Sequence, residues 1–340
     1  MWGCVAVFGF TLLGLSILGV LNAEDPIAIE VKCPQTGTAP INHTMLRVAL
    51  EEWGYNASFQ IDATVKYGPI STWDTSNVET FQSMFITMEM PFNGSIGCWD
   101  TSAVTTMNLA FNSNSIFDQD ISDWDTGKVS DMGGMFILAY AFNQPIGKWD
   151  TSAVTNMAGM FSDATAFNQD LGGWDTSNVI SIATMFSCTS STGTQGPCAF
   201  NNAIGSGNWG NPISMEGVFS YASAFNYDIG SWDTGNATNM LNMFYKAKVF
   251  NQDIGSWNTA QVTIMKQMFE GALAFDQDIS SWDNSSLTLA ADMVDSSGMS
   301  CVHFKALRCA WDIHGTGSAS PLASTGTENP GNCTWFPSTC

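Results

Sequence analysis

Aspartate side chains recur at a fixed position of the chain, four residues before a repeated tryptophan. Carboxylates at a regular spacing have the chemistry to bind calcium or a cationic partner. They are equally typical of a solvated acidic face, and both interpretations stay open. Three of the aspartates fall in consecutive copies of the repeated segment. The column contains Asp120, Asp170, Asp228, Asp253 and Asp278.

A second aspartate column directly follows the tryptophan. Its members precede Thr and Ser or Gly in most copies, and such residues form turns by bonding free backbone N–H groups. We therefore expect these aspartates to be structural. They are Asp74, Asp100, Asp125, Asp150, Asp175, Asp233 and Asp283.

The nine cysteines and three histidines form no strong metal or catalytic pattern. We expect a local Cys188–Cys198 disulfide around a short Gly/Pro-containing loop. Cys301, His303, Cys309 and His314 lie close together, but their spacing matches no strong zinc motif, so disulfides are the favoured interpretation. If residues 301–309 are helical, the two cysteines there lie about 12 Å apart and pair elsewhere.

Several pairings remain open for the other cysteines. Cys333 and Cys340 are candidate partners of Cys301 and Cys309, or could close a small terminal loop, and Cys33–Cys98 is a further possibility. The sequence contains no nucleophile elbow, zinc-protease motif or phosphate-binding glycine loop. We therefore expect a protein that is not an enzyme and has no cofactor, with calcium as the one cofactor hypothesis.

The tryptophans are spaced by about 25 residues, apart from one gap of 35 residues. A fixed period in this range indicates a stack of repeats, in which each unit completes the core of its neighbours. The repeated aromatic and Met-Phe positions are thus expected to be core. The markers are Trp73, Trp99, Trp124, Trp149, Trp174, Trp209, Trp232, Trp257 and Trp282.

Each unit contains two apolar patterns separated by a turn. Phe142, Ile146 and Trp149 predict a short extended segment, and the helical spacing of Val154, Met157 and Phe161 predicts a short helix. The expected fold class is an α/β repeat: a leucine-rich-repeat-like solenoid with short parallel strands on one face and short helices on the other, capped at both ends.

Six segments follow from these patterns. An apolar run predicts a signal peptide at 1–23, with an uncleaved anchor as the alternative. Next come a lead-in and capping helix at 24–65 and about nine repeats at 66–282. An insertion at 188–198 interrupts the repeats. A cap at 283–314 and a flexible Gly/Ser/Thr-rich tail at 315–340 complete the chain.

The chain carries 31 acidic and 10 basic residues, a net charge of -21. This balance excludes nucleic acid as an expected partner, because phosphates require Lys and Arg. No second membrane-spanning run follows the leader. Eight cysteines remain if Cys4 leaves with the signal peptide, and an even number suggests disulfides. Together with the leader and the Asn-x-Ser/Thr sequons, they predict a secreted or extracellular-surface protein. The candidate N-glycosylation sites are Asn42, Asn56, Asn93, Asn236, Asn284 and Asn332.

The segments FNQDIGSWDT, VTNMAGMF and AFNQD resemble those of BspA-type leucine-rich-repeat surface proteins, in the 25-residue version of mycoplasma lipoproteins and algal secreted proteins. The resemblance covers about residues 66–290. It implies a leucine-rich-repeat-like solenoid with an extracellular binding role and no catalytic residues. Two departures are that Leu is nearly absent from the repeat positions and that the lipid-attachment cysteine is missing.

The leading functional hypothesis is a non-catalytic module that binds an extracellular protein or glycan, or mediates adhesion. The first alternative is a structural component of a cell wall or extracellular matrix. A third is calcium, mineral or ice-surface binding through the Asp and Thr rows. The residues that vary between copies are the expected source of specificity.

Overall fold

The computed structural model describes residues 41–54, 63–86, 92–188, 197–205 and 214–313. The chain divides into two compact units, Met1–Cys33 and Pro34–Cys340, and all described residues belong to the second. The expected signal peptide, the tail and the sites at Cys33, Asn56 and Asn332 lie outside the described residues, as do Cys333 and Cys340.

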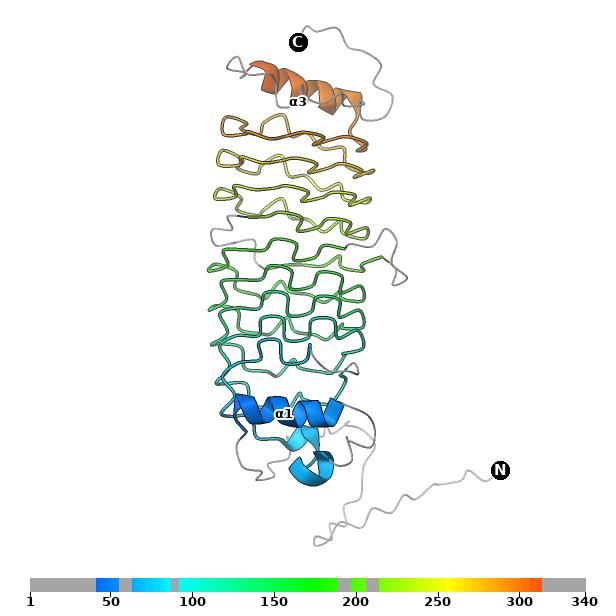
Figure 1. Ribbon diagram of the computed structural model, residues 1–340. Helices are drawn as coiled ribbons and strands as arrows, with labels where there is room; N and C mark the ends of the chain where they lie inside the picture. The colour runs from blue at the N-terminus through cyan, green and yellow to red at the C-terminus, as the bar shows by residue number, and fades with distance from the viewer. Residues whose placement is uncertain (1–40, 55–62, 87–91, 189–196, 206–213, 314–340) are drawn as a thin grey trace, which may run out of the picture. The chain divides into compact units, whose positions relative to one another are not determined.

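Three named helical elements flank or enter the repeats: α1 (His43–Gly54), the 3-10 helix η1 (Ile70–Thr72) and α3 (Cys301–Ile313). Residues 63–67 are also helical. Asn42 caps α1, because its Oδ1 accepts the Met45 N–H at 3.0 Å. Leu46 and Leu50 of α1 are buried, which explains why this apolar helical face lies against the first repeat (Figure 1).

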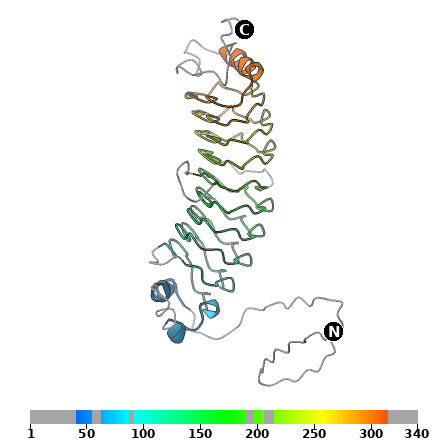
Figure 2. The same cartoon turned by 90° about the vertical axis from the view of Figure 1, so that its right-hand side faces the viewer.

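The repeats stack through backbone hydrogen bonds between equivalent residues about 25 positions apart. The N–H groups of Met132, Gly134 and Phe136 donate to carbonyls of the next unit at 2.8–3.0 Å. Parallel bridges mark this ladder, one residue per unit, and Figure 2 shows the successive layers from the side. The bridging residues are Thr80, Thr106, Asp131, Asn156, Ser181, Ser214, Asn239, Ile264 and Leu289.

The short helices predicted for the second half of each unit are absent from the described repeats. From Met157 to Ala164 the chain instead forms consecutive turns, in which Met160 donates to Met157 and Ala164 to Phe161. Gly159 and Asp163 have left-handed φ angles of 65° and 57°, which no right-handed helix accommodates. Apolar residues three or four apart therefore face the core without a helix.

The residues from Met157 to Ala164 also make the backbone hydrogen bonds that join neighbouring units. The sequence predicts the strand of each unit elsewhere, around Phe142–Trp149. At the positions equivalent to Phe142–Trp149 in the other units, the described residues contain one parallel bridge, Leu171↔Ile204. The physical reason is that alternate N–H groups of the turn series point along the stack, where the next unit provides carbonyls.

The core consists of aromatic and aliphatic columns that run through the stack. Trp149 and its neighbour Trp124 stack with ring centroids 6.5 Å apart and planes 4° apart. The Phe136 ring lies 3.8 Å from that of Phe142 and 5.7 Å from that of Phe161. These side chains are at most 4% exposed, so their predicted assignment to the core is confirmed.

Polar side chains form a further ladder along the stack. Backbone N–H groups of Asn143, Asn168 and Asn226 donate to the Oδ1 atom of the equivalent Asn or Asp of the preceding unit, at 2.8–3.0 Å. Each Asn thus satisfies a backbone donor that the local turn leaves unpaired, and the units are fixed in register.

Candidate functional site

The five aspartates predicted as cation or partner ligands are exposed and lie in local turns. In each, Oδ1 accepts the backbone N–H of the residue two positions later, at 2.8–3.0 Å. The Ser280 hydroxyl and N–H also lower the pKa of Asp278, with burial opposing them. The residues of this column are Asp120, Asp170, Asp228, Asp253 and Asp278.

Asp228, Asp253 and Asp278 occupy the same register of consecutive units, but the structure does not gather them into a chelating cluster. Among the described residues, no group of three or more His, Cys, Asp or Glu side chains could hold a metal. The turns themselves pack closely: a Cβ added at Gly230 would lie 2.5 Å from the Asp253 carbonyl oxygen. A calcium role therefore stays a prediction.

The aspartates that follow the tryptophans are structural, as the sequence predicts. Asp150 Oδ1 accepts both the N–H and the hydroxyl of Ser152, at 3.0 and 2.6 Å. The hydroxyl bond, followed by the backbone bond, holds the pKa of Asp150 below its usual value. Thr151 then donates its hydroxyl to the Asp175 carbonyl of the next unit at 2.8 Å.

The predicted Cys188–Cys198 disulfide is present and closes the insertion, with Cα atoms 6.4 Å apart. Cys98, Cys301 and Cys309 are disulfide-bonded as well. Because these thiols are oxidised, the Cys301–Cys309 region does not offer thiolate ligands to zinc.

The described sequons differ in what their side chains do. Asn42 caps α1, and Asn93 Oδ1 accepts the Asp118 N–H at 3.1 Å. Asn236 is exposed and Asn284 is half-buried. Their use as glycan sites stays a prediction.

A cluster that the sequence interpretation missed lies on the outer surface of two adjacent units: Tyr221, Tyr245 and Lys246, here called the Tyr–Lys cluster. The two tyrosine rings meet edge to face, with centroids 5.2 Å apart. Lys246 Nζ lies 5.1 Å from the Tyr221 centroid and 4.7 Å from that of Tyr245. It also donates to the Tyr221 hydroxyl at 3.4 Å.

The stacking of the units positions this cluster. The Tyr221 N–H donates to the Tyr245 carbonyl at 2.6 Å, which places one tyrosine over the other. Tyr221, Lys246 and Gly271 share a register with left-handed φ angles of 58°, 56° and 70°. A Cβ at Gly271 would lie 3.0 Å from Lys246 Cγ, so the glycine leaves room for the lysine stem.

The ammonium of the Tyr–Lys cluster is held in its charged form. Hydrogen bonds with Tyr245 and then Tyr221 raise the pKa of Lys246 above its usual value. The result is a fixed cation beside two half-exposed aromatic faces, on a chain of net charge -21. Such a group can stack on a flat apolar ligand face and donate hydrogen bonds to an acceptor.

Comparison with protein families identifies repeated matches along the chain. The family described as "Mycoplasma protein of unknown function, DUF285" matches residues 55–151, 122–195 and 191–303. The chain belongs to this DUF285 family. The three overlapping matches span the repeats and agree with a chain built of repeated units. No curated protein and no solved structure matches the chain.

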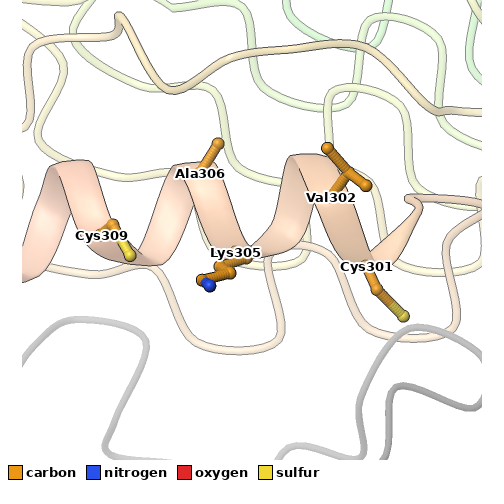
Figure 3. Close-up of a pocket in the computed structure, with 5 residues that line it drawn as sticks. All are labelled: Cys301, Val302, Lys305, Ala306 and Cys309. Atoms are coloured by element: carbon orange, nitrogen blue, oxygen red, sulfur yellow. The ribbon is translucent and has the colours of Figure 1, made fainter. Parts of the chain in front are cut away.

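In this DUF285 chain a second surface feature lies on α3. A hollow of about 360 Å³ is lined by Cys301, Val302, Lys305, Ala306 and Cys309. Figure 3 shows the two cysteines and Lys305 pointing to one side of the helix. Val302 is 74% exposed and Leu307 is fully buried, so the hollow lies on the helix face away from the repeats.

None of the helices in the described part of this DUF285 chain is long and apolar enough to cross a bilayer.

Proposed function

We propose that this DUF285 protein is a secreted or cell-surface binding module with a leucine-rich-repeat-like solenoid fold and no catalytic activity. Support for the fold comes from the parallel ladder that joins equivalent residues of successive units. Support for the role comes from the Tyr–Lys cluster, which the repeats present on their surface. The partner is an extracellular protein or glycan.

The Tyr–Lys cluster is the observation that carries this proposal. At the register of Tyr221 and Lys246, other units have Ser113, Leu138 or Asp163. The repeats thus keep their core residues constant while the residue at this position changes. Tyr is enriched at binding interfaces because it offers a large rigid ring and a polar tip at low entropic cost.

The two described histidines contact the repeats from the terminal helices. His43 Nδ1 hydrogen-bonds the Thr80 carbonyl at 3.1 Å, and His303 Nδ1 pairs with Asp276 at 2.7 Å. Both rings therefore join a terminal helix to the repeats.

The test is a glycan array and a pull-down with the secreted chain. The variant is Tyr221→Ala/Tyr245→Ala, and the matched control is Tyr140→Ala, a half-buried tyrosine outside the cluster. We expect affinity for the captured partner to fall about tenfold or more in the double variant only, as for a central interface residue. Unchanged binding by a correctly folded double variant would disprove the role of the cluster.

A structural role in a wall or matrix is the alternative, supported by the hydrogen-bond ladders that repeat along the stack. In that case the secreted chain forms concentration-dependent oligomers in sedimentation experiments and shows no saturable partner. Such a result, with an intact Tyr–Lys cluster, favours the structural role over the binding role.

Cation, mineral or ice-surface binding is the third candidate. The triple variant Asp228→Asn/Asp253→Asn/Asp278→Asn keeps the turn acceptors and removes three charges. If the column binds calcium, calorimetry shows heat with the natural chain and none with the triple variant. Equal traces for the two proteins contradict this candidate.

A further inference from the structure

Lys246 is held by aromatic rings in a chain that is rich in carboxylates. The sequence has 31 acidic residues against 10 basic ones. Within the described part of the chain, however, no carboxylate forms an ion pair with Lys246. Its ammonium instead lies 5.1 Å from the ring centroid of Tyr221 and 4.7 Å from that of Tyr245. The positive charge is therefore available to an anion from outside the chain.

A second lysine–tyrosine contact shows the difference that a carboxylate makes. Lys66 Nζ lies 4.7 Å from the Tyr67 ring centroid, as near as Lys246 lies to Tyr245. Lys66 also donates to both carboxylate oxygens of Glu52, at 2.8 and 2.9 Å. The charge of Lys66 is thus neutralised within the protein, and that of Lys246 is not.

The carboxylates nearest to the Tyr–Lys cluster in the stack are engaged by amides. The Lys246 N–H donates to the Glu270 carbonyl at 2.7 Å, but the Glu270 carboxylate accepts the side-chain amide of Gln267 at 2.7 Å. In the unit of Tyr221, Glu216 Oε2 accepts Asn239 Nδ2 at 3.1 Å. The repeats therefore satisfy these acids without using the lysine.

Two further lysines add positive charge to the same units. Lys248 is exposed and follows Lys246 by two residues. Lys266 is half-buried in the next unit, where its carbonyl accepts the Asn242 N–H at 3.0 Å. Neither forms an ion pair with a described carboxylate. Three of the ten basic residues thus lie in two neighbouring units, and their potential attracts anions over about 8 Å at physiological salt.

The aromatic rings narrow the class of anion. Tyr221 and Tyr245 are half-exposed and offer rigid apolar faces. A pyranose ring has a flat C–H face that packs against such a ring, and a carboxylate or sulfate on the sugar can accept from the ammonium. An acidic peptide side chain supplies the charge but no flat face. A broad acidic protein surface would also be repelled by the net charge of -21.

We propose that the Tyr–Lys cluster binds an anionic sugar residue of an extracellular glycan, with the carboxylate or sulfate on Lys246 Nζ and the sugar ring against the tyrosines. A lysine ammonium has more N–H donors than the two tyrosine hydroxyls accept, so one remains for the anion. Lys248 and Lys266 attract the ligand to the site. This inference rests on the proposed binding role of the cluster and names the ligand class.

Calorimetry with the full-length secreted protein tests the ligand class. The probes are an oligouronate, a sulfated oligosaccharide, the carboxyl-reduced form of the oligouronate, and an oligoglutamate of equal charge. We expect the oligouronate or the sulfated probe to bind at least about tenfold more tightly than the reduced, neutral one, since a hydrogen bond to a charged group is lost. The probe that binds identifies the anion. Equal affinity for the neutral sugar, tighter binding of oligoglutamate, or no binding of either anionic sugar overturns the proposal.

The variant Lys246→Gln tests the role of the ammonium. Its affinity for the anionic sugar should fall about tenfold, whereas Lys148→Gln, which removes an exposed lysine outside the cluster, should bind as the natural chain does. Thermal unfolding checks that both variants are folded. If Lys246→Gln does not fold, the natural chain still decides the matter, because its affinity must fall as the salt concentration rises. An affinity that is independent of salt overturns the proposal.

The partner captured by the natural chain separates this inference from the binding role itself. If Tyr221→Ala/Tyr245→Ala loses that partner and Lys246→Gln retains it, the binding role stands and the anionic-sugar inference is wrong. If the double tyrosine variant also retains it, both are wrong. Loss of the partner in both variants, with competition by the anionic sugar, supports both.

Discussion

Asp276 Oδ1 lies 2.7 Å from His303 Nδ1 and joins the last full repeat to α3. The same oxygen accepts the Ser300 N–H at 2.7 Å. Asp276 occupies the register of the Asn ladder, since its own N–H donates to Asn251 Oδ1. The ladder therefore continues into the C-terminal helix, with a carboxylate where most units have an amide.

The first prediction concerns the pH dependence of this contact. Burial acts to raise the pKa of Asp276, but hydrogen bonds from Ser300 and His303 outweigh it, and the pKa is lowered overall. A lowered pKa stabilises the fold above the pKa of the unfolded chain, and this stability is lost as the pH falls. Asp276→Asn keeps the acceptor but removes the charge.

We therefore expect the natural chain to be more stable than Asp276→Asn at pH 6, by less than about 1 kcal/mol because the pair is partly exposed. The difference should vanish well below about pH 4, the ordinary range of aspartate. Thermal unfolding at several pH values measures it. A difference that stays constant down to pH 2 contradicts the role of the charge.

The second prediction concerns the interior of the Asn ladder. Asn226 Oδ1 accepts the Asn251 N–H at 2.8 Å. Asn226→Ala leaves that half-buried donor unpaired and should lower the free energy of unfolding by about 1–3 kcal/mol. Asn226→Asp retains an acceptor, as Asp118 and Asp276 do naturally, and should cost less.

Urea unfolding compares the two Asn226 variants with Ser231→Ala, an exposed control in the same unit. If Asn226→Ala and Asn226→Asp lower the free energy of unfolding equally, the hydrogen bond to Asn226 is not the source of stability.

The sequence was sufficient to predict the repeat register and the buried side chains, because both depend on periodicity. It was insufficient to distinguish helix from turns between Met157 and Ala164. Residues at spacings of three and four face one side in either structure, and the left-handed φ of a non-glycine residue such as Asp163 has no clear sequence signal.

The Tyr–Lys cluster was missed for a different reason. Its contact joins Tyr221 to residues 24 and 25 positions later, so it exists only once the units are stacked. The sequence did offer one signal for this cluster. Tyr245 and Lys246 are larger than the residues that most other repeats have at the equivalent positions. In contrast, the turn role of Asp150 involves residues two apart and was predictable locally.

The third prediction concerns the insertion. The Cys188–Cys198 bond joins residues ten positions apart, between Phe186 of one unit and Phe200 of the next. Its removal in Cys188→Ser/Cys198→Ser should lower the free energy of unfolding by about 2–3 kcal/mol, through the added freedom of the unfolded chain. Chemical unfolding without reductant measures this. A single Cys188→Ser variant should show a similar loss, while an unchanged midpoint in both contradicts the prediction.

The last prediction concerns the tryptophan column. Trp149 is 3% exposed, stacks on Trp124, and donates its Nε1–H to the Ile121 carbonyl at 3.1 Å. Trp149→Phe keeps a ring but removes this hydrogen bond, and the Ile121 carbonyl keeps only the Trp124 N–H at 3.2 Å. The loss of one of its two hydrogen bonds should cost about 0.5–1.5 kcal/mol. Trp149→Ala also leaves a cavity and should cost about 3–5 kcal/mol.

The position of the substitution should matter as well. Trp73 makes the equivalent stack with Trp99 but has no repeat tryptophan on its other side among the described residues. Since each repeat depends on its neighbours, Trp73→Ala should destabilise the array less than Trp149→Ala and should leave the later units folded. Hydrogen exchange resolved by unit distinguishes the two variants. Equal, global loss of protection in both would show that the array unfolds as one cooperative body, against the expectation of nearest-neighbour coupling.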